Sequence, residues 1–341
     1  MKAYLLGLLV GGFSALALVA GGFIAVMTFK PQNLIAPAIS SVESVNEKFR
    51  FIRLHPGLNP EVVLVGSSVA WRHIDGAAFS AGTGATFLNG ATALLAVHQT
   101  RYLTKFYTEL FPRASTFVML TNLTDFGDCS QNRNIFKPDD AEKYVRGEWP
   151  EVFFYMKYLT LARYYSAYRI WPKMTVPFAG DRWQDEFGSS PLQVADRGLR
   201  YGPLKFDPTC IEELKQLSAE LRAGGRQLAV VITPVRPGYL ANYPDARSQL
   251  ETIVCEIDPQ LHKDGNLLVD LREADVQESD YWDAFHLQWS AVQRLTVGLS
   301  KELAPFVRRG NKAPEMQIAS CRCGINEPRS GDDAFQLPLE Q

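Results

Sequence analysis

The longest feature of the hydrophobic pattern lies at the start of the chain, where residues 3–29 carry no charged side chain. A helix of about 20 apolar residues is long enough to cross the hydrocarbon core of a bilayer. Lys2 precedes the run, as in a signal sequence, but the run is longer than the core of a cleaved signal. The pattern predicts an uncleaved signal-anchor over residues 1–30. Small residues near Ala15, Ala17 and Ala20 leave cleavage open as an alternative.

This anchor predicts where the rest of the chain lies. A single span that follows a short, positively charged amino terminus leaves everything after Lys30 on the far side of the membrane. We therefore expect a single-pass protein of the inner (plasma) membrane, with its folded part extracytoplasmic or periplasmic.

After residue 60 the pattern changes to short apolar runs that alternate with longer helical stretches. The runs are bounded by turn residues, which is typical of buried parallel strands. They lie at 61–65, 85–88, 116–120, 227–232 and 266–270, and the main helical stretches lie at 93–111, 211–223 and 290–307. The alternation predicts an α/β fold of three layers, in which helices cover both faces of a parallel sheet.

Three regions do not show this alternation of short apolar runs and helical stretches. Residues 31–60 contain Pro31 and Pro37 and a possible short helix at 41–54, so they form a connector that is either a stalk or a packing arm. Residues 129–206 are rich in Trp and Tyr and are predicted to be a helical insertion. Its aromatic residues serve either plain helix packing or contact with a carbohydrate, an acyl group, the membrane or a partner. Residues 307–341 form a polar tail outside the main domain, 61–306.

Composition and charge exclude several classes of function. Thirty-five basic and 37 acidic residues give a net charge of -2, so no overall positive field attracts nucleic acid. The five cysteines include one close pair, Cys321-Arg-Cys323, and a single intervening residue is a poor spacing for zinc. Gly82-Thr-Gly84 lacks the context of a phosphate-binding loop. We expect no metal and no cofactor, and the pairing of the cysteines stays open.

The best candidate for chemistry is Ser68. A serine becomes a strong nucleophile only where a base takes its proton and donors stabilise the resulting oxyanion. Ser68 follows the apolar run 61–65 through Gly66 and Ser67, at the carboxyl end of a predicted strand, where open α/β sheets bind their ligands.

The best candidate for the base is His286. Asp283 lies three residues before it, and on a tight turn this spacing brings a carboxylate to one imidazole nitrogen while the other nitrogen faces a serine. Each motif is common by chance. Their order is far more specific, since one follows the first strand and the other precedes the last helix.

With these motifs, residues 61–306 resemble the SGNH (GDSL-like) hydrolase superfamily. Gly66-Ser67-Ser68 is similar to its first block, and Asp283-Ala-Phe-His286 matches its last. The resemblance implies a flavodoxin-like sheet, Ser68 as nucleophile, His286 as base and Asp283 as the acid that orients it. It also implies an oxyanion hole formed by the amide of Ser68, Gly90, and Asn122 or Thr124.

Two departures from the superfamily pattern indicate a particular branch. Ser67 replaces the usual aspartate, and Leu120-Thr-Asn122-Leu-Thr124 replaces Gly-x-Asn-Asp in the third block. With the anchor and the insertion, they make the chain similar to the proteins of teichoic acid D-alanylation and exopolysaccharide O-acetylation. In those systems, the resemblance implies, a multispanning membrane-bound O-acyltransferase supplies an acyl group that the anchored protein places on a polysaccharide hydroxyl.

The sequence leaves the function open among three alternatives. An acyltransferase and a membrane-tethered carbohydrate esterase use the same motifs and differ only in the acceptor. A scaffold that binds polymer without catalysis would keep the fold alone. Arg236 follows a strand end and Trp71 follows Ser68, so both are candidates for substrate binding, although a rigid loop and helix packing also account for them.

Overall fold

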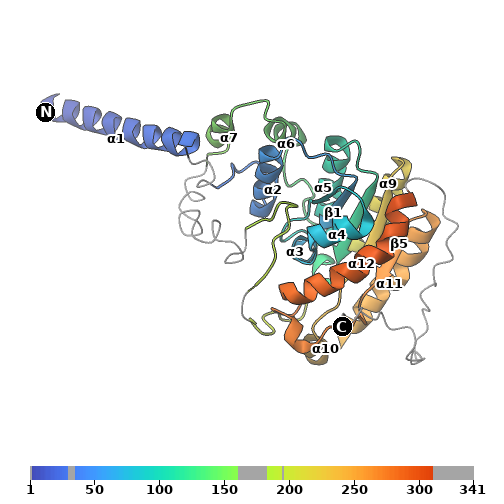
Figure 1. The fold of residues 1–341 in the computed structure, drawn as a ribbon. Helices are drawn as coiled ribbons and strands as arrows, with labels where there is room; N and C mark the ends of the chain where they lie inside the picture. Colours follow the sequence, from blue (N-terminus) through green and yellow to red (C-terminus); the bar gives the residue numbers. More distant parts are fainter. Residues whose placement is uncertain (1, 30–34, 160–182, 194–195, 310–341) are drawn as a thin grey trace, which may run out of the picture.

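The computed structural model describes residues 2–29, 35–159, 183–193 and 196–309. At its centre lies a sheet of five parallel strands in the order β2-β1-β3-β4-β5 (Figure 1). The strands are β1 (Val62–Gly66), β2 (Phe87–Asn89), β3 (Thr116–Thr121), β4 (Gln227–Ile232) and β5 (Leu267–Asp270). This order is one of the common doubly wound orders, and it confirms the predicted α/β class with a parallel sheet.

Side chains of each strand alternate between two apolar cores, one on each face of the sheet. Val63 and Val65 of β1 point into one core, whereas Val62 and Leu64 point into the other. The first core is covered by α2 (Glu43–Leu54), α5 (Val97–Leu110), α9 (Thr209–Ala223) and α11 (Asp245–Lys263). The second is covered by α3 (Ser68–Arg72), α4 (Gly76–Thr83) and α12 (Trp289–Arg309). Helices therefore lie on both faces, which buries all five residues of β1.

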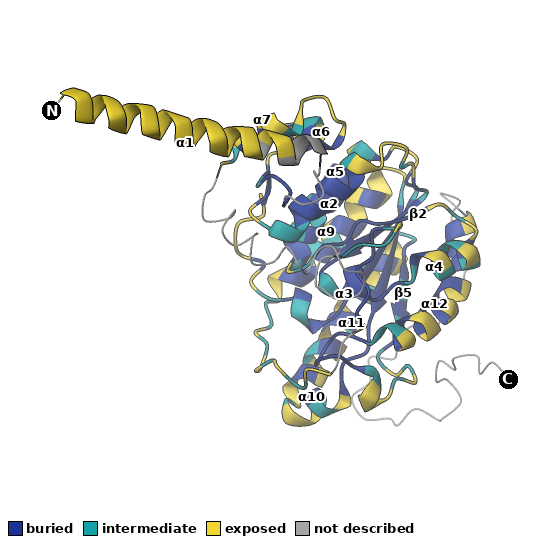
Figure 2. Ribbon diagram, turned by 60° about the vertical axis from the view of Figure 1, so that its left-hand side comes forward, coloured by how far each residue is buried: buried dark blue, intermediate teal, exposed yellow. Residues whose placement is uncertain are grey.

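Helix α1 (Lys2–Phe29) extends away from the folded domain. It has 28 residues, and the side chains of residues 2–22 are exposed (Figure 2). An apolar helix exposed on all sides has no protein core to bury it, and residues 2–22 are long and apolar enough to span a membrane.

The connector is a packing arm and not a stalk. Ile35, Ala36 and Ile39 are buried, and α2 packs against the sheet's first core through Phe49. The Phe49 ring lies 5.0 Å from that of Phe136, edge to face. Burial of this ring stabilises the packing of residues 35–54 on the domain by roughly 3 kcal/mol.

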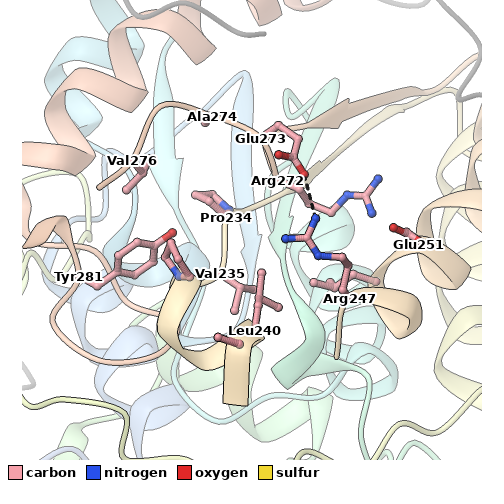
Figure 3. A pocket seen from close by; sticks show the side chains of 13 residues that line it. Pro234, Val235, Leu240, Arg247, Glu251, Arg272, Glu273, Ala274, Val276 and Tyr281 are labelled. Atoms are coloured by element: carbon pink, nitrogen blue, oxygen red, sulfur yellow. Dashed lines mark ion pairs between the residues drawn. The ribbon is translucent and has the colours of Figure 1, made fainter. Parts of the chain in front are cut away.

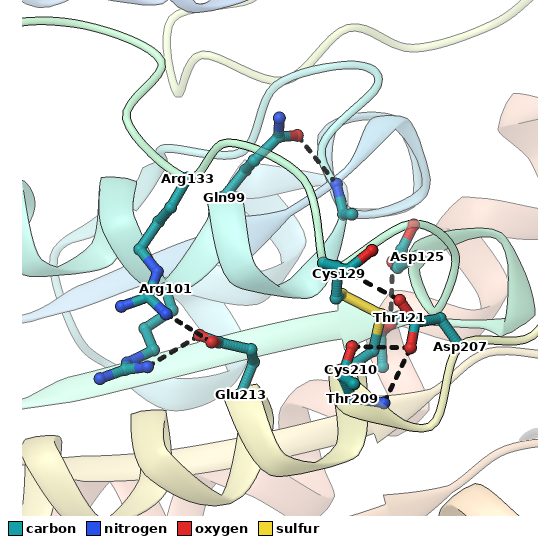
Figure 4. The surroundings of a disulfide bond; sticks show 12 residues. Gln99, Arg101, Thr121, Asp125, Cys129, Arg133, Asp207, Thr209, Cys210 and Glu213 are labelled. Atoms are coloured by element: carbon teal, nitrogen blue, oxygen red, sulfur yellow. Dashed lines mark hydrogen bonds and ion pairs between the residues drawn. A yellow bond between two sulfur atoms is a disulfide. The ribbon is translucent and has the colours of Figure 1, made fainter.

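The insertion is closed at its base by a disulfide between Cys129 and Cys210 (Figure 4). Its described helices are α6 (Pro138–Val145) and α7 (Glu151–Lys157), and residues 160–182 and 194–195 lie outside the description. The helical prediction thus holds for the first part, whereas the described residues 183–193 carry no helix. Cys255 is also disulfide-bonded, while Cys321, Cys323 and residues 310–341 lie outside the described parts.

Further short elements complete the chain at the ends of the strands. They are the 3-10 turns η2 (Leu123–Asp125) and η4 (Glu278–Asp280) and the helix α10 (Pro237–Asn242). All of them follow β3, β4 or β5, so they lie on the carboxyl side of the sheet, where α3 also begins.

Candidate active site

Ser68 is positioned by the abrupt end of β1. Gly66 has φ +136°, and a Cβ there would lie 2.6 Å from the carbonyl oxygen of Leu120, so only glycine fits. The Ser67 hydroxyl accepts a hydrogen bond from the amide of Val69, and Ser68 opens α3 with its side chain half-buried. Because β2 and β3 flank β1 on either side, Ser68 lies at the switch point of the sheet.

His286 and Asp283 lie together on a tight turn just before α12. The amide of Trp282 donates to the carbonyl of His286 at 2.7 Å, and the turn is held further by the amides of Phe285 and His286, which both donate to Asp283 Oδ1 at 2.8 Å. The imidazole Nδ1 lies 3.0 and 2.9 Å from the two carboxylate oxygens of Asp283.

The structure brings Ser68 and His286 into direct contact. His286 Nε2 lies 2.9 Å from Ser68 Oγ, although the two residues are 218 positions apart in the chain. His286 and Asp283 are buried, whereas Ser68 keeps an accessible side. The predicted triad is therefore present as geometry, with one member open to a reactant.

The charge on Asp283 suits the role of His286 as a base. Burial raises the pKa of the Asp283 carboxyl, but hydrogen bonds from the His286 ring and from two backbone amides bring the pKa below its usual value. An ionised Asp283 accepts Nδ1–H of the ring, which leaves Nε2 as an acceptor for the Ser68 proton.

His73 is a neighbour whose part in the site the sequence did not show. Its Nε2 accepts a hydrogen bond from the amide of Leu287 at 2.8 Å, and its ring meets that of His286 edge to face at 5.9 Å. Full burial, followed by the proximity of His286, holds the pKa of His73 well below its usual value. His73 is thus a neutral acceptor that fixes the backbone beside the base. Its only sequence signal was its place five residues after Ser68.

The predicted oxyanion donors differ in whether their hydrogen-bonding groups are already used within the protein. The amide of Gly90 donates to the carbonyl of Leu64 at 2.9 Å, so it is used within the sheet and the oxyanion role is not supported by this geometry. Thr124 directs its hydroxyl to Asn122 and Asp125. Asn122 is fully buried, and its amide nitrogen makes one long contact, 3.4 Å, to Thr233. The roles of Asn122 and of the Ser68 amide stay predictions.

Asp125 is a second residue that the sequence analysis missed. It is fully buried beside the Cys129–Cys210 disulfide (Figure 4). Its carboxylate accepts hydrogen bonds from Thr121 at 2.8 Å and from Thr124 at 3.0 Å. Burial raises the pKa of Asp125 to about 6, which hydrogen bonds from Ser67, Thr121 and Thr124 partly offset. Asp125 therefore links the third block of the sequence to the segment that carries Ser68.

Trp71 and Arg236 both make contacts within the protein, and their roles in substrate binding stay predictions. Trp71 is 1% exposed, packs in the second core, and donates Nε1–H to the carbonyl of Gly188 at 3.1 Å. Arg236 forms two hydrogen bonds of 2.9 Å with Asp196 and a third bond, of 2.5 Å, with Glu278. All three side-chain nitrogens of Arg236 donate hydrogen bonds, so the residue connects the segments that carry Asp196 and Glu278.

A buried lysine connects the insertion to α3, the helix that begins at Ser68. Lys48 of α2 donates to the carbonyl of Asn89 at 2.7 Å and to that of Gly188 at 2.5 Å. Asn89 in turn donates to the carbonyls of Ala70 and Trp71 in α3, at 3.2 Å each. Burial lowers the pKa of Lys48 to about 7, an effect that nearby Asp185 partly offsets. We call Lys48, Asn89, Asp185 and Gly188 the lysine cluster.

A hollow of about 370 Å³ lies past the ends of β4 and β5 (Figure 3). Pro234, Val235 and Leu240 line one side, and the charged side chains include Arg272, which pairs with Asp270 at 2.7 Å. No triad residue lines this hollow. Among the described residues, no group of three or more His, Cys, Asp or Glu side chains is arranged to hold a metal.

Comparison of the chain with models of known protein families, with curated proteins and with solved structures finds no match.

Proposed function

We propose that the chain is a membrane-anchored serine enzyme that transfers acyl groups, with Ser68 as nucleophile, His286 as base and Asp283 as the orienting acid. One observation carries the proposal: the unbroken series of contacts from Asp283 through His286 to Ser68 Oγ, with hydrogen-bond distances of 2.9 to 3.0 Å. Such a series is the arrangement that makes a serine hydroxyl nucleophilic.

The first half of the reaction forms an acyl-enzyme. The Ser68 oxygen attacks the carbonyl carbon of an ester while its proton passes to His286 Nε2. The resulting imidazolium is stabilised by ionised Asp283. The tetrahedral intermediate then expels the alcohol, which takes the proton from Nε2, and the acyl group remains on Ser68 as an ester.

The second half moves the acyl group to an acceptor. A hydroxyl enters the place left by the alcohol, gives its proton to His286 Nε2 and attacks the acyl carbon, and Ser68 regains the proton as it leaves. We infer that the acceptor is a polysaccharide hydroxyl and that the acyl group is small, in the manner of acetyl. The anchor, the Gly66-Ser67-Ser68 motif and the insertion support this choice, because together they resemble proteins that acylate cell-envelope polysaccharides. That resemblance implies that a multispanning membrane-bound O-acyltransferase supplies the acyl group.

The proposed location is the outer side of the plasma membrane. An apolar helix of the necessary length begins at Lys2, and the Cys129–Cys210 disulfide joins residues far apart in the chain. Disulfides of this kind persist in oxidising compartments and are rare in the cytosol.

The test is intact-protein mass spectrometry after exposure of the full chain to p-nitrophenyl acetate. We expect the wild type to gain one acetyl group, mapped to Ser68 by peptide analysis, and Ser68→Ala to gain none at that peptide. Ser80→Ala is a matched control, because Ser80 is a half-buried serine in the nearby helix α4. It should be acylated as fast as the wild type.

Acceptors then separate transfer from hydrolysis. If the enzyme is a transferase, an added oligosaccharide shortens the lifetime of acetyl-Ser68 and appears as an acetylated product. Fast loss of the acetyl group to water alone, with no acetylated sugar, would instead identify an esterase. Failure of the wild type to acquire any acetyl group at Ser68 would overturn the catalytic proposal.

A further inference from the structure

Helix α7 presents an apolar face to solvent. Five side chains at helical spacing lie on one side of the helix and its ends, and we call them the α7 apolar face: Trp149, Val152, Phe153, Met156 and Leu159, which are 36 to 68% exposed. The opposite side of α7 carries Phe154 and Tyr155, which are fully buried. Exposed apolar side chains gathered in this way mark an interaction surface.

The path of the chain places this face next to the membrane. The 28 residues of α1 form a helix about 42 Å long, which matches a bilayer with its headgroup regions. Ile35 follows Phe29 by only six residues, so it lies within about 20 Å of the end of α1. The hydroxyl of Tyr155 donates to the carbonyl of Ile35 at 2.6 Å, so α7 is joined to a residue that lies within this distance of the end of α1.

Hydrogen bonds and an ion pair hold the segment that begins at Ile35, helix α2 and helix α7 together. The amide of Ala36 donates to Glu47 in α2 at 3.0 Å, and Arg50 of α2 donates to the Tyr155 hydroxyl at 3.2 Å. Arg50 also pairs with Glu151 at the start of α7 at 3.4 Å. Both views of the molecule show α7 beside the carboxyl-terminal end of α1 (Figures 1 and 2).

The composition of the face suits the interface between headgroups and acyl chains. The ammonium of Lys143 lies over the Trp149 ring, 4.9 Å from its centroid. The neighbouring Arg146 and Lys157 are exposed and pair with Glu142 and Asp140. Tryptophan, phenylalanine and methionine flanked by lysine and arginine are characteristic of helices that lie in this interface.

We propose that the α7 apolar face inserts into the outer surface of the same bilayer that α1 crosses. The inference rests on the proposed anchoring through α1 and not on catalysis. With two attachments, the domain is held in one orientation to the membrane, so that the accessible side of Ser68 faces a fixed direction.

The test is photo-crosslinking of the full chain in vesicles of phosphatidylcholine and phosphatidylglycerol. The photoreactive residue p-benzoylphenylalanine replaces Val152 in one protein and Val297 in another. These valines are a matched pair, because both lie on helices and each is 37% exposed, while Val297 belongs to α12 on the other face of the sheet. We expect about tenfold more lipid adduct from position 152 than from position 297, as interfacial insertion requires.

Three results would overturn the inference in distinguishable ways. A chain that does not float with the vesicles refutes the anchoring and the inference with it. A chain that floats but gives equal lipid adducts at the two positions refutes insertion alone. Adducts from position 152 to another protein in native membranes, in place of lipid, would assign the face to a protein partner. None of these readouts depends on acyl transfer.

Discussion

The triad and the lysine cluster are both buried polar groups that hold α3, and they differ in where their hydrogen bonds end. In the triad, the series of bonds runs from Asp283 through His286 to the hydroxyl of Ser68, which keeps an accessible side. In the lysine cluster, Lys48 is fully buried and its bonds end on backbone carbonyls.

This difference separates a reactive group from a structural one. Lys48 has a strongly lowered pKa, a feature that often marks active sites. Yet its ammonium touches main-chain oxygens that cannot react, whereas the triad ends at a nucleophile within reach of a substrate. The direction and end point of a polar network are therefore better guides to function here than the size of a pKa shift.

The strongest way to break the comparison is to remove the base. We expect His286→Ala to lower the rate of acetyl transfer from p-nitrophenyl acetate by about 10⁴-fold or more, because Ser68 loses its proton acceptor. His55→Ala serves as control, since His55 is an exposed histidine at the end of α2. Equal rates for the two variants would remove the triad from the mechanism.

The lysine cluster should respond in stability instead. Lys48→Met leaves the carbonyls of Asn89 and Gly188 without their donor and Asp185 without its cation, so we expect the free energy of unfolding to fall by about 4 kcal/mol. Urea unfolding measures this, and Lys105→Met, at an exposed lysine of α5, should change it little. An unchanged stability would mean that the cluster does not hold the insertion.

Asp125 provides a test of the polar network beside Ser68 through pH. Its pKa is raised in the folded state, from 3.8 to about 6, so its contribution to stability is full below pH 4 and is lost as the pH rises through 6. Over that window the wild type should lose about 3 kcal/mol relative to Asp125→Asn. Parallel urea curves at pH 4 and pH 7 would show it, and identical pH dependence of the two proteins would contradict it.

The smallest effect is expected at His73, a positioning residue. His73→Leu removes the acceptor of the Leu287 amide and should lower kcat about tenfold, by misplacing His286, with little change in KM. His73→Gln offers a carbonyl acceptor and should recover most of the rate. If both variants lose activity equally, the histidine acts through its bulk and not through this hydrogen bond.

The strands and the triad could be predicted because their signals are local. Residues 227–232 were predicted as a strand from the apolar run that begins at Leu228, and the structure has a strand with those bounds. Glycine and serine after such a run, and Asp283 three residues before His286, are short motifs whose geometry follows from a turn. The parallel sheet then brings the two motifs together at one edge.

The remaining features depend on contacts between distant segments, which short motifs do not encode. Gly90 was assigned to the oxyanion hole, but its amide points toward Leu64 because of how β1 and β2 pair. Trp71 was a candidate for substrate binding with helix packing as the alternative, and only the fold shows that it is buried in α3. Lys48 belongs to no short motif, and its partner Gly188 lies 140 positions away.

The most direct measurement is covalent capture of the full chain by a fluorophosphonate, which reacts only with a serine whose proton is taken up by a base. We expect a single phosphonylated residue, Ser68, and loss of labelling at that residue in His286→Ala. Labelling at a different serine, or undiminished labelling of Ser68 without His286, would contradict the claim that these two residues form a catalytic pair.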